Sequence, residues 1–270
     1  MSKSKKKNIN VLFIGDIFGE SGILKVESTL PNMRKKYNLD LVIAQSENVS
    51  GRKGLDPIDY NRLMAAGVDV FTLGNHAFAK SSINEIINNE NILRPHNVDS
   101  IYPGKGTNIF QIGDLKVRVT SLLGITFNEL NSPWKQHHAN NFFDSIDEII
   151  KTDDSDFHII DFHAETTSEK NVFALYLDNY WPTKVSALLG THTHVQTNDA
   201  KRLDNNLLYI TDVGMTGPKN SAIGANFEEV YRKMRFNDKK NFVASDNESE
   251  LNCVFLKINK NFSKIFLIKK

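Results

Sequence analysis

Residues 11–16 read VLFIGD, a short apolar run that stops abruptly at polar residues, and this pattern organises the first third of the chain. Apolar residues at helical spacing follow over 21–36. The pattern returns at 41–44, which precedes Glu47-Asn48, and at 68–73, which ends at Gly74-Asn75-His76. Strands that alternate with helices in this way predict a parallel sheet.

The later segments complete this outline. Residues 57–66 read as a helix capped by Asp56, and another helix is expected between 81 and 89. The turn signal Gly113-Asp114 predicts a hairpin of 108–112 with 115–123. The remaining expectations are a loop over 132–141, a helix over 145–151, strands over 157–162, 185–189 and 207–210, and a hairpin of 251–258 with 262–268. We therefore expect a mixed α/β architecture with two packed sheets and helices outside.

Composition indicates an ordinary soluble protein, with 40% hydrophobic and 24% charged residues. We expect one domain over 9–270 and a disordered, basic N-terminus over 1–8. Cys253 is the sole cysteine, so an intrachain disulfide is excluded. Together with the lack of a signal-peptide pattern or a long apolar run, this predicts a cytoplasmic protein without a membrane segment. The formal net charge of +1 argues against a dedicated nucleic-acid surface.

Five polar side chains come at the ends of separate apolar runs: Asp16, Glu47, Asn75, His163 and His192. We expect them to converge, because ligand crevices of α/β sheets lie beyond the carboxyl ends of the strands. Carboxylate, amide and imidazole donors suit Fe, Mn, Zn or Ni rather than Ca. On an extended segment, His192 and His194 would share one face and could serve two neighbouring ions. Glu47 could bridge those ions, which predicts a two-metal centre.

Each residue alone also fits a structural role. Asp16 suits a turn, Asn75 suits the start of a helix, and His163 suits a hydrogen-bonded core position. The set favours metal binding because all of its members come at strand ends.

The chain resembles the calcineurin-like metallophosphoesterases, in which the same motifs occur in the same order: Gly15-Asp16, Glu47-Asn48, Gly74-Asn75-His76, His163 and Gly190-Thr191-His192-Thr193-His194. More narrowly, it is similar to the bacterial branch that acts as 2′,3′-cyclic-nucleotide 2′-phosphodiesterases. That likeness covers nearly the whole chain after Asn8 and includes Arg94-Pro95 and the segments 13–16, 46–48, 161–165, 167–170, 190–197 and 211–218. The resemblance implies a four-layer α/β/β/α sandwich of two mixed sheets flanked by helices.

The resemblance also implies a role for each motif residue. One ion would be held by Asp16, Glu47 and His194, and the other by Glu47, Asn75, His163 and His192. Asn48 would bind the first ion or contact a bound oxyanion, and His76 would protonate the leaving oxygen. The wider superfamily has a histidine where this chain has Phe18, and an aspartate in place of Glu47-Asn48. The narrower branch shares both changes, which leave the first ion with fewer strong ligands.

The expected reaction is hydrolysis of phosphoesters by attack of metal-bound hydroxide, with 2′,3′-cyclic nucleotides giving 3′-nucleotides. Two divalent or mixed-valence transition metal ions are expected, iron first, with manganese, zinc or nickel as alternatives. The expected partners are a small anionic phosphoester or nucleotide and further copies of the chain in a dimer or tetramer. Candidate substrate contacts in loops after strands, which equally suit loop-shaping roles, are Arg94, Thr126, Thr197, Met215 and Thr216.

Two other hypotheses compete with the phosphoesterase prediction. Amidohydrolase-type barrels also use a His-x-His pair, but there the pair opens the order of ligands, whereas here it comes last. A metal-stabilised regulatory scaffold with only residual phosphatase activity is the second alternative.

Overall fold

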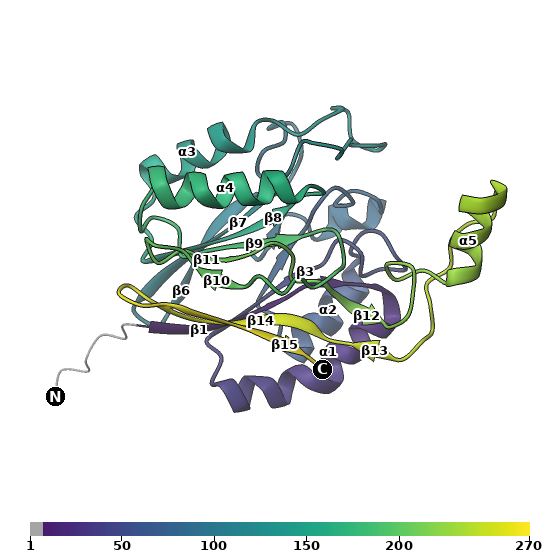
Figure 1. The fold of residues 1–270 in the computed structure, drawn as a ribbon, viewed down its shortest axis with the longest axis horizontal. Helices are drawn as coiled ribbons and strands as arrows, with labels where there is room; N and C mark the ends of the chain where they lie inside the picture. Colours follow the sequence, from purple (N-terminus) through teal and green to yellow (C-terminus); the bar gives the residue numbers. More distant parts are fainter. Residues whose placement is uncertain (1–7) are drawn as a thin grey trace.

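Two six-stranded sheets pack face to face in the computed structural model, which describes residues 8–270 (Figure 1). The first has the order β15-β14-β1-β3-β4-β5, with β1 (Asn8–Ile14), β3 (Leu41–Gln45), β4 (Val70–Thr72), β5 (Ile92–Leu93), β14 (Asn252–Asn259) and β15 (Lys264–Lys269). The second has the order β10-β11-β9-β8-β7-β6, with β6 (Thr107–Ile112), β7 (Leu115–Leu123), β8 (Phe157–His163), β9 (Ala187–Thr191), β10 (Lys201–Arg202) and β11 (Leu208–Ile210). A small third sheet joins β2 (Asp16–Ile17), β12 (Met215–Pro218) and β13 (Ser249–Glu250).

Helices cover the outer face of each large sheet (Figure 1). The first sheet is covered by α1 (Gly19–Tyr37), α2 (Pro57–Ala66) and the 3-10 helix η1 (Ser81–Glu85), and the second by α3 (Phe142–Thr152) and α4 (Thr167–Tyr180). Only α5 (Phe227–Phe236) projects from the body, and none of its residues is buried. The four-layer α/β/β/α sandwich of mixed sheets is therefore confirmed. Among the described residues, no helix is long and apolar enough to cross a membrane.

The run that opens the chain is apolar throughout because both faces of β1 are covered. Ile9, Val11 and Phe13 point into the core between the two sheets, whereas Leu12 and Ile14 pack against the helices. Successive side chains of a strand point to opposite faces, so a strand between two layers loses the usual alternation of apolar and polar residues.

Several elements differ from the sequence predictions. The helix expected between 81 and 89 is only the 3-10 turn η1, since the asparagines at 84, 88 and 89 compete with helical hydrogen bonds. Helices α4 and α5 come where none was predicted. The predicted disordered segment over 1–8 lies outside the described residues except for Asn8, which begins β1. Both predicted hairpins are confirmed, since β6 pairs with β7 and β14 with β15 in antiparallel register.

Candidate metal centre

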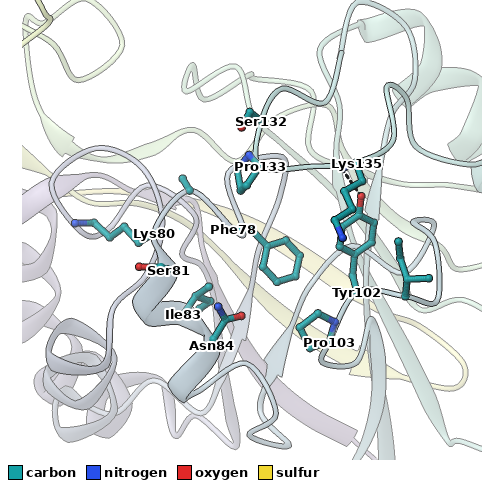
Figure 2. Close-up of a pocket in the computed structure, with 12 residues that line it drawn as sticks. Phe78, Lys80, Ser81, Ile83, Asn84, Tyr102, Pro103, Ser132, Pro133 and Lys135 are labelled. Carbon is teal, nitrogen blue, oxygen red and sulfur yellow. Dashed lines mark hydrogen bonds between the residues drawn. The ribbon is translucent and has the colours of Figure 1, made fainter.

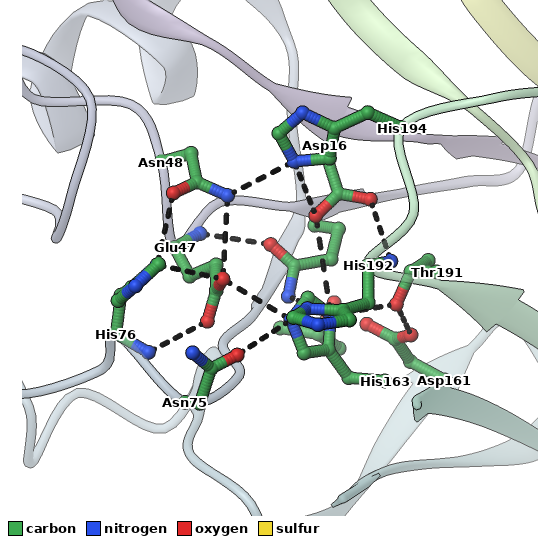
Figure 3. Close-up of polar contacts among 12 residues, drawn as sticks. Asp16, Glu47, Asn48, Asn75, His76, Asp161, His163, Thr191, His192 and His194 are labelled. Atoms are coloured by element: carbon green, nitrogen blue, oxygen red, sulfur yellow. Dashed lines mark hydrogen bonds and ion pairs between the residues drawn. The ribbon is translucent and has the colours of Figure 1, made fainter. Parts of the chain in front are cut away.

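The predicted ligands gather where the carboxyl ends of the two sheets meet (Figure 3). The first sheet supplies Asp16 after β1, Glu47 after β3 and Asn75 after β4. The second sheet supplies His163 as the last residue of β8, with His192 and His194 just beyond β9. Each sheet therefore contributes half of the cluster, and the site exists only because the sheets pack together.

One group of ligand atoms centres on His163 Nε2. This nitrogen lies 3.1 Å from Glu47 Oε1, 3.1 Å from Asn75 Oδ1 and 3.0 Å from His192 Nδ1. The ligand atoms of Glu47, His163 and His192 all lie within 4.8 Å of one another. A Cβ on Gly74 would collide with Glu47 Oε2 and the His163 ring, so the glycine keeps this space open. These donors fit one transition metal ion.

A second group forms beside it around Asp16. Its Oδ2 accepts a hydrogen bond from the His192 backbone N–H at 3.2 Å, and its Oδ1 lies 3.7 Å from His194 Nε2. Among residues 8–270, this buried Oδ1 has no hydrogen-bond partner. A buried carboxylate oxygen without a hydrogen bond is costly, and a cation held with His194 and Glu47 would satisfy it. The residues therefore fit a second ion.

Buried opposite charges shift the pKa values within the cluster. Burial alone would raise the pKa of Glu47, but the neighbouring His163 and His76 hold it well below its ordinary value. Burial would lower the pKa of His163, but Glu47 and Asp16 raise it to about 9. Burial, reinforced by His163, lowers the pKa of His192 to about 3. The negative charge therefore stays on Glu47, and His192 stays neutral, which is the state that binds a metal.

The loop that carries His192 and His194 is not extended, contrary to the geometry assumed from the sequence. Their φ angles are 99° and 67°, in the left-handed region that non-glycine residues rarely adopt. The two rings reach their separate positions through these turns and not through the alternation of a strand. Such strain persists where the surrounding structure fixes it, typically at functional sites.

A buried ion pair fixes this loop from beneath. Lys170 of α4 donates to the Thr191 carbonyl at 2.9 Å and to Asp212 Oδ2 at 2.8 Å, and neither charged side chain is exposed. The same Asp212 oxygen accepts from the Thr193 backbone N–H at 3.1 Å and its hydroxyl at 2.8 Å. Both charged residues lie in segments that carry the family resemblance, but neither was assigned a role from it. The pattern Thr166-x-x-Glu169 is a capping-box sequence that could have predicted the start of α4. A helix that starts there contains Lys170 in its first turn.

Polar partners orient the imidazoles from outside. His163 Nδ1 lies 2.9 Å from the Thr191 hydroxyl, which donates to Asp161 at 2.7 Å. His192 Nε2 lies 3.1 Å from Glu165 Oε2, so its other nitrogen is left to face His163. Partners of this kind fix ring orientation and raise ligand basicity. The sequence reasoning gave no role of this kind to Asp161 or Glu165.

His76 stands at the rim of the cluster. Its Nδ1 lies 3.0 Å from Glu47 Oε1 and 3.1 Å from Asn48 Oδ1, while one quarter of the side chain is exposed. The Asn48 amide nitrogen lies 3.3 Å from both Glu47 Oε1 and His194 Nε2. Phe18 contacts the His194 ring edge-on, with centroids 5.8 Å apart.

The structure does not bring the candidate substrate contacts to this cluster. The buried Arg94 guanidinium donates to the carbonyls of Pro95, Tyr102 and Pro103. The Thr126 backbone N–H donates to Glu169, and the Thr197 hydroxyl donates to Asp199. Thr216 is fully buried and its hydroxyl donates to the Asn252 carbonyl, and Met215 lies beside it in β12. Each of these contacts shapes a loop or a strand.

A hollow on the described surface, separate from the metal cluster, is lined by residues of η1 and of the loops around it (Figure 2). It measures about 820 Å³, and Phe78, Tyr102 and Lys135 are among the residues that line it. Trp134 packs against the rings of Phe78 and Tyr102, and its Nε1 donates to the Asn75 carbonyl at 2.6 Å. Because the lining of the hollow holds none of the metal-cluster residues, we place the chemistry in the cavity that His76, His192 and His194 line.

Comparison with known proteins identifies the family of this chain. A family model described as YmdB-like protein matches residues 12–270. The chain is 39% identical over 269 residues to a candidate phosphatase/phosphodiesterase of Mycoplasma genitalium, across 97% of this chain and 92% of the relative. It is 34% identical over 266 residues to a 2′,3′-cyclic-nucleotide 2′-phosphodiesterase of Bacillus subtilis, across 97% and 96% of the two chains.

Solved structures show the same fold. A phosphatase from Mycoplasma pneumoniae superposes with a TM-score of 0.89 at 37% identity, covering 97% of this chain and 93% of that one. A protein from Thermus thermophilus gives a TM-score of 0.86 at 34% identity, covering 97% and 100%.

Proposed function

Because the chain belongs to the YmdB-like family of calcineurin-like metallophosphoesterases, whose members include phosphatases and phosphodiesterases, we propose that it is a two-metal phosphodiesterase acting on 2′,3′-cyclic nucleotides. The observation that supports the metals most directly is the buried Oδ1 of Asp16, which has no hydrogen-bond partner among residues 8–270 and lies beside the Glu47, His163 and His192 cluster. The cyclic-nucleotide substrate rests on the similarity to the Bacillus subtilis enzyme.

The residues divide the work as follows. Asp16, Glu47 and His194 would hold one ion, and Glu47, Asn75, His163 and His192 the other. When bound, two such ions lower the pKa of a water molecule and neutralise charge on the phosphoryl oxygens. Water adds across the P–O2′ bond, with its oxygen going to phosphorus and a proton going to the leaving 2′ oxygen.

His76 is the proton donor in this proposal. Asn48 Oδ1 and Glu47 Oε1 both accept from its Nδ1, which orients the ring and leaves Nε2 to protonate the 2′ oxygen. The Asn48 amide nitrogen faces the first ion position between Glu47 and His194. In this orientation Asn48 suits donation to a phosphoryl oxygen better than metal binding.

The His76→Ala change tests the proton donor. We expect kcat for a 2′,3′-cyclic nucleotide to fall about 10²–10⁴-fold, because general acid catalysis contributes that much. Metal content should stay at the wild-type level, since the ring contacts ligand residues but lies at the rim. The matched control is His138→Ala in an exposed loop, which should leave kcat unchanged. Unchanged hydrolysis in His76→Ala with both ions bound would exclude this role.

The function itself is tested by metal analysis and a substrate screen. Purified protein should contain transition metal ions, and chelation should abolish hydrolysis until iron, manganese, zinc or nickel is restored. Among cyclic nucleotides, phosphomonoesters and short RNA, we expect 2′,3′-cyclic nucleotides to be the best substrates and 3′-nucleotides the products. No hydrolysis with any of these metals would overturn the proposal. A cellular effect that survives the loss of hydrolysis in His76→Ala would favour the scaffold alternative.

A further inference from the structure

A cavity of about 750 Å³ opens directly over the metal cluster. Glu47, His76 and His192 form part of its floor, and the opposite wall comes from α5 and the segment 239–242. Ligand sites in proteins commonly measure about 300–1,000 Å³, so the cavity exceeds the needs of a metal-bound phosphate alone.

The cavity wall concentrates positive charge. Five basic side chains line it: Arg52, Lys53, Lys233, Lys239 and Lys240. Its two carboxylates are Glu47, which belongs to the metal cluster, and Glu165, which contacts His192. Within residues 8–270, no carboxylate lies within 4 Å of any of the five charged groups, and the nearby Asp238 instead pairs with Arg232 at 3.1 Å. The whole chain carries a formal net charge of only +1, so this is a local feature and not a general basicity.

The aromatic ring of Phe242 contacts two of the five basic side chains of this wall. The Arg52 guanidinium lies 5.7 Å from the centre of its ring, and the Lys233 ammonium lies 4.8 Å from it. Arg52 lies in the loop that follows β3, and Lys233 lies in α5. Through Phe242, these contacts join two segments that are distant in the sequence. The wall thus combines cations with an aromatic ring, which is how proteins bind single-stranded nucleic acid.

The cyclic mononucleotide of the proposed function does not use this wall. Its single phosphate carries one negative charge, and that phosphate must sit on the metal cluster to react. The five cations would then face a ligand with no further anion. A substrate that extends away from the scissile phosphate with more phosphates would match them.

We propose that the site acts on the 3′ end of an RNA strand that terminates in a 2′,3′-cyclic phosphate. The terminal phosphate binds at the metal cluster, the preceding phosphates lie against Lys233, Lys239 and Lys240, and a base packs near Phe242. This rests on the proposed function and names its substrate class. Water opens the terminal ring at the P–O2′ bond and leaves an RNA with a 3′-phosphate.

The test compares three substrates with the same scissile group: adenosine 2′,3′-cyclic phosphate, the same nucleotide with a 5′-phosphate, and a tetranucleotide ending in the cyclic phosphate. We expect kcat/KM to be about tenfold higher for the tetranucleotide and its advantage to fall with salt, because phosphate contacts release counterions. In Lys239→Gln/Lys240→Gln, the ratio of tetranucleotide to mononucleotide should move toward one.

The matched control is Lys35→Gln/Lys36→Gln, which removes the same charge from the far end of α1. This helix begins beside Phe18, and the control pair lies 16 and 17 residues after its first residue, which is about 25 Å along the helix axis. Both lysines are exposed, so the substrate ratio should stay at the wild-type value.

Binding gives a second readout that does not depend on turnover. A labelled tetranucleotide with a 3′-phosphate should bind protein from which metal has been removed by a chelator. The double glutamine variant should reduce the slope of log affinity against log salt by about 1.4 if two phosphate contacts are lost.

Equal kcat/KM for all three substrates, or equal binding by variant and control, would overturn the RNA proposal. A full gain from the 5′-phosphate alone would also overturn it in favour of a doubly phosphorylated nucleotide. Loss of all hydrolysis with this binding intact would reject the phosphodiesterase proposal alone.

Discussion

Glu47→Gln is expected to remove hydrolysis more completely than any other single change. Glu47 contacts His163 on one side of the cluster, and its neighbours Asn48 and His76 lie on the other, so both proposed ions share this carboxylate. An amide keeps the shape but loses the charge that two cations require. The loss should exceed the roughly 10²–10⁴-fold expected for His76→Ala, because it weakens both ions and not one proton transfer.

Metal analysis and circular dichroism on the same sample separate this effect from misfolding. Glu47→Gln should lose bound metal and keep the wild-type spectrum. The control is Glu129→Gln, an exposed loop carboxylate, which should keep both metal and activity. If Glu47→Gln retained two ions and most of the activity, the shared-ligand assignment would be wrong.

Asp212→Ala is expected to have the largest effect on stability. It leaves the Lys170 ammonium fully buried, with the Thr191 carbonyl as its remaining hydrogen-bond partner. Removing one partner of a buried ion pair costs about 3–5 kcal/mol, because an uncompensated charge remains. Urea unfolding followed by circular dichroism measures this loss. The exposed pair of Lys105 and Glu90 provides the control, since Lys105→Ala should leave the free energy of unfolding nearly unchanged.

A paired replacement separates stability from positioning. Lys170→Met/Asp212→Leu removes both charges, and apolar replacements of buried pairs are often neutral or stabilising. We expect it to recover most of the unfolding free energy and still to bind metal weakly, because the Thr193 backbone and hydroxyl lose the oxygen that holds the His192 loop. Wild-type metal affinity in this double variant would show that the pair serves stability alone.

The sequence predicts the strands well because most of them lie between two layers. A run such as 11–14 is apolar on both faces, and an abrupt polar stop marks its carboxyl end. Cap and turn residues act locally, so the start of α2 at Asp56 and the turn at Gly113-Asp114 follow from a few neighbours; Asp56 accepts from the Asp59 N–H at 3.0 Å. These features need no knowledge of the rest of the chain.

Helices α4 and α5 show where this reasoning fails. In α4 the apolar residues Val172 and Leu175 are about half exposed, while Lys170 and Asp178 are buried. Its hydrophobic periodicity is therefore weak, and the burial of Lys170 depends on Asp212, which is distant in sequence. Helix α5 has no buried residue, so no layer of the fold imposes a pattern on it.

The site was predictable as a set of residues but not as a geometry. Its members stand at strand ends, which marks them from the sequence alone. The rule for open sheets suggests one crevice, yet the ligands come from the facing edges of two sheets. The left-handed turns at His192 and His194, and the contact of Glu165 with His192, depend on tertiary packing that no local pattern encodes.

The division of the ligands between two sheets has a consequence for metal binding during protein synthesis. During synthesis Asp16, Glu47 and Asn75 leave the ribosome well before His163, His192 and His194. The three early ligands are all oxygen donors, and the three histidine ligands arrive with the second sheet. We therefore expect newly made chains to bind metal only after the two sheets have packed together. Metal binding would then indicate that a chain has completed folding.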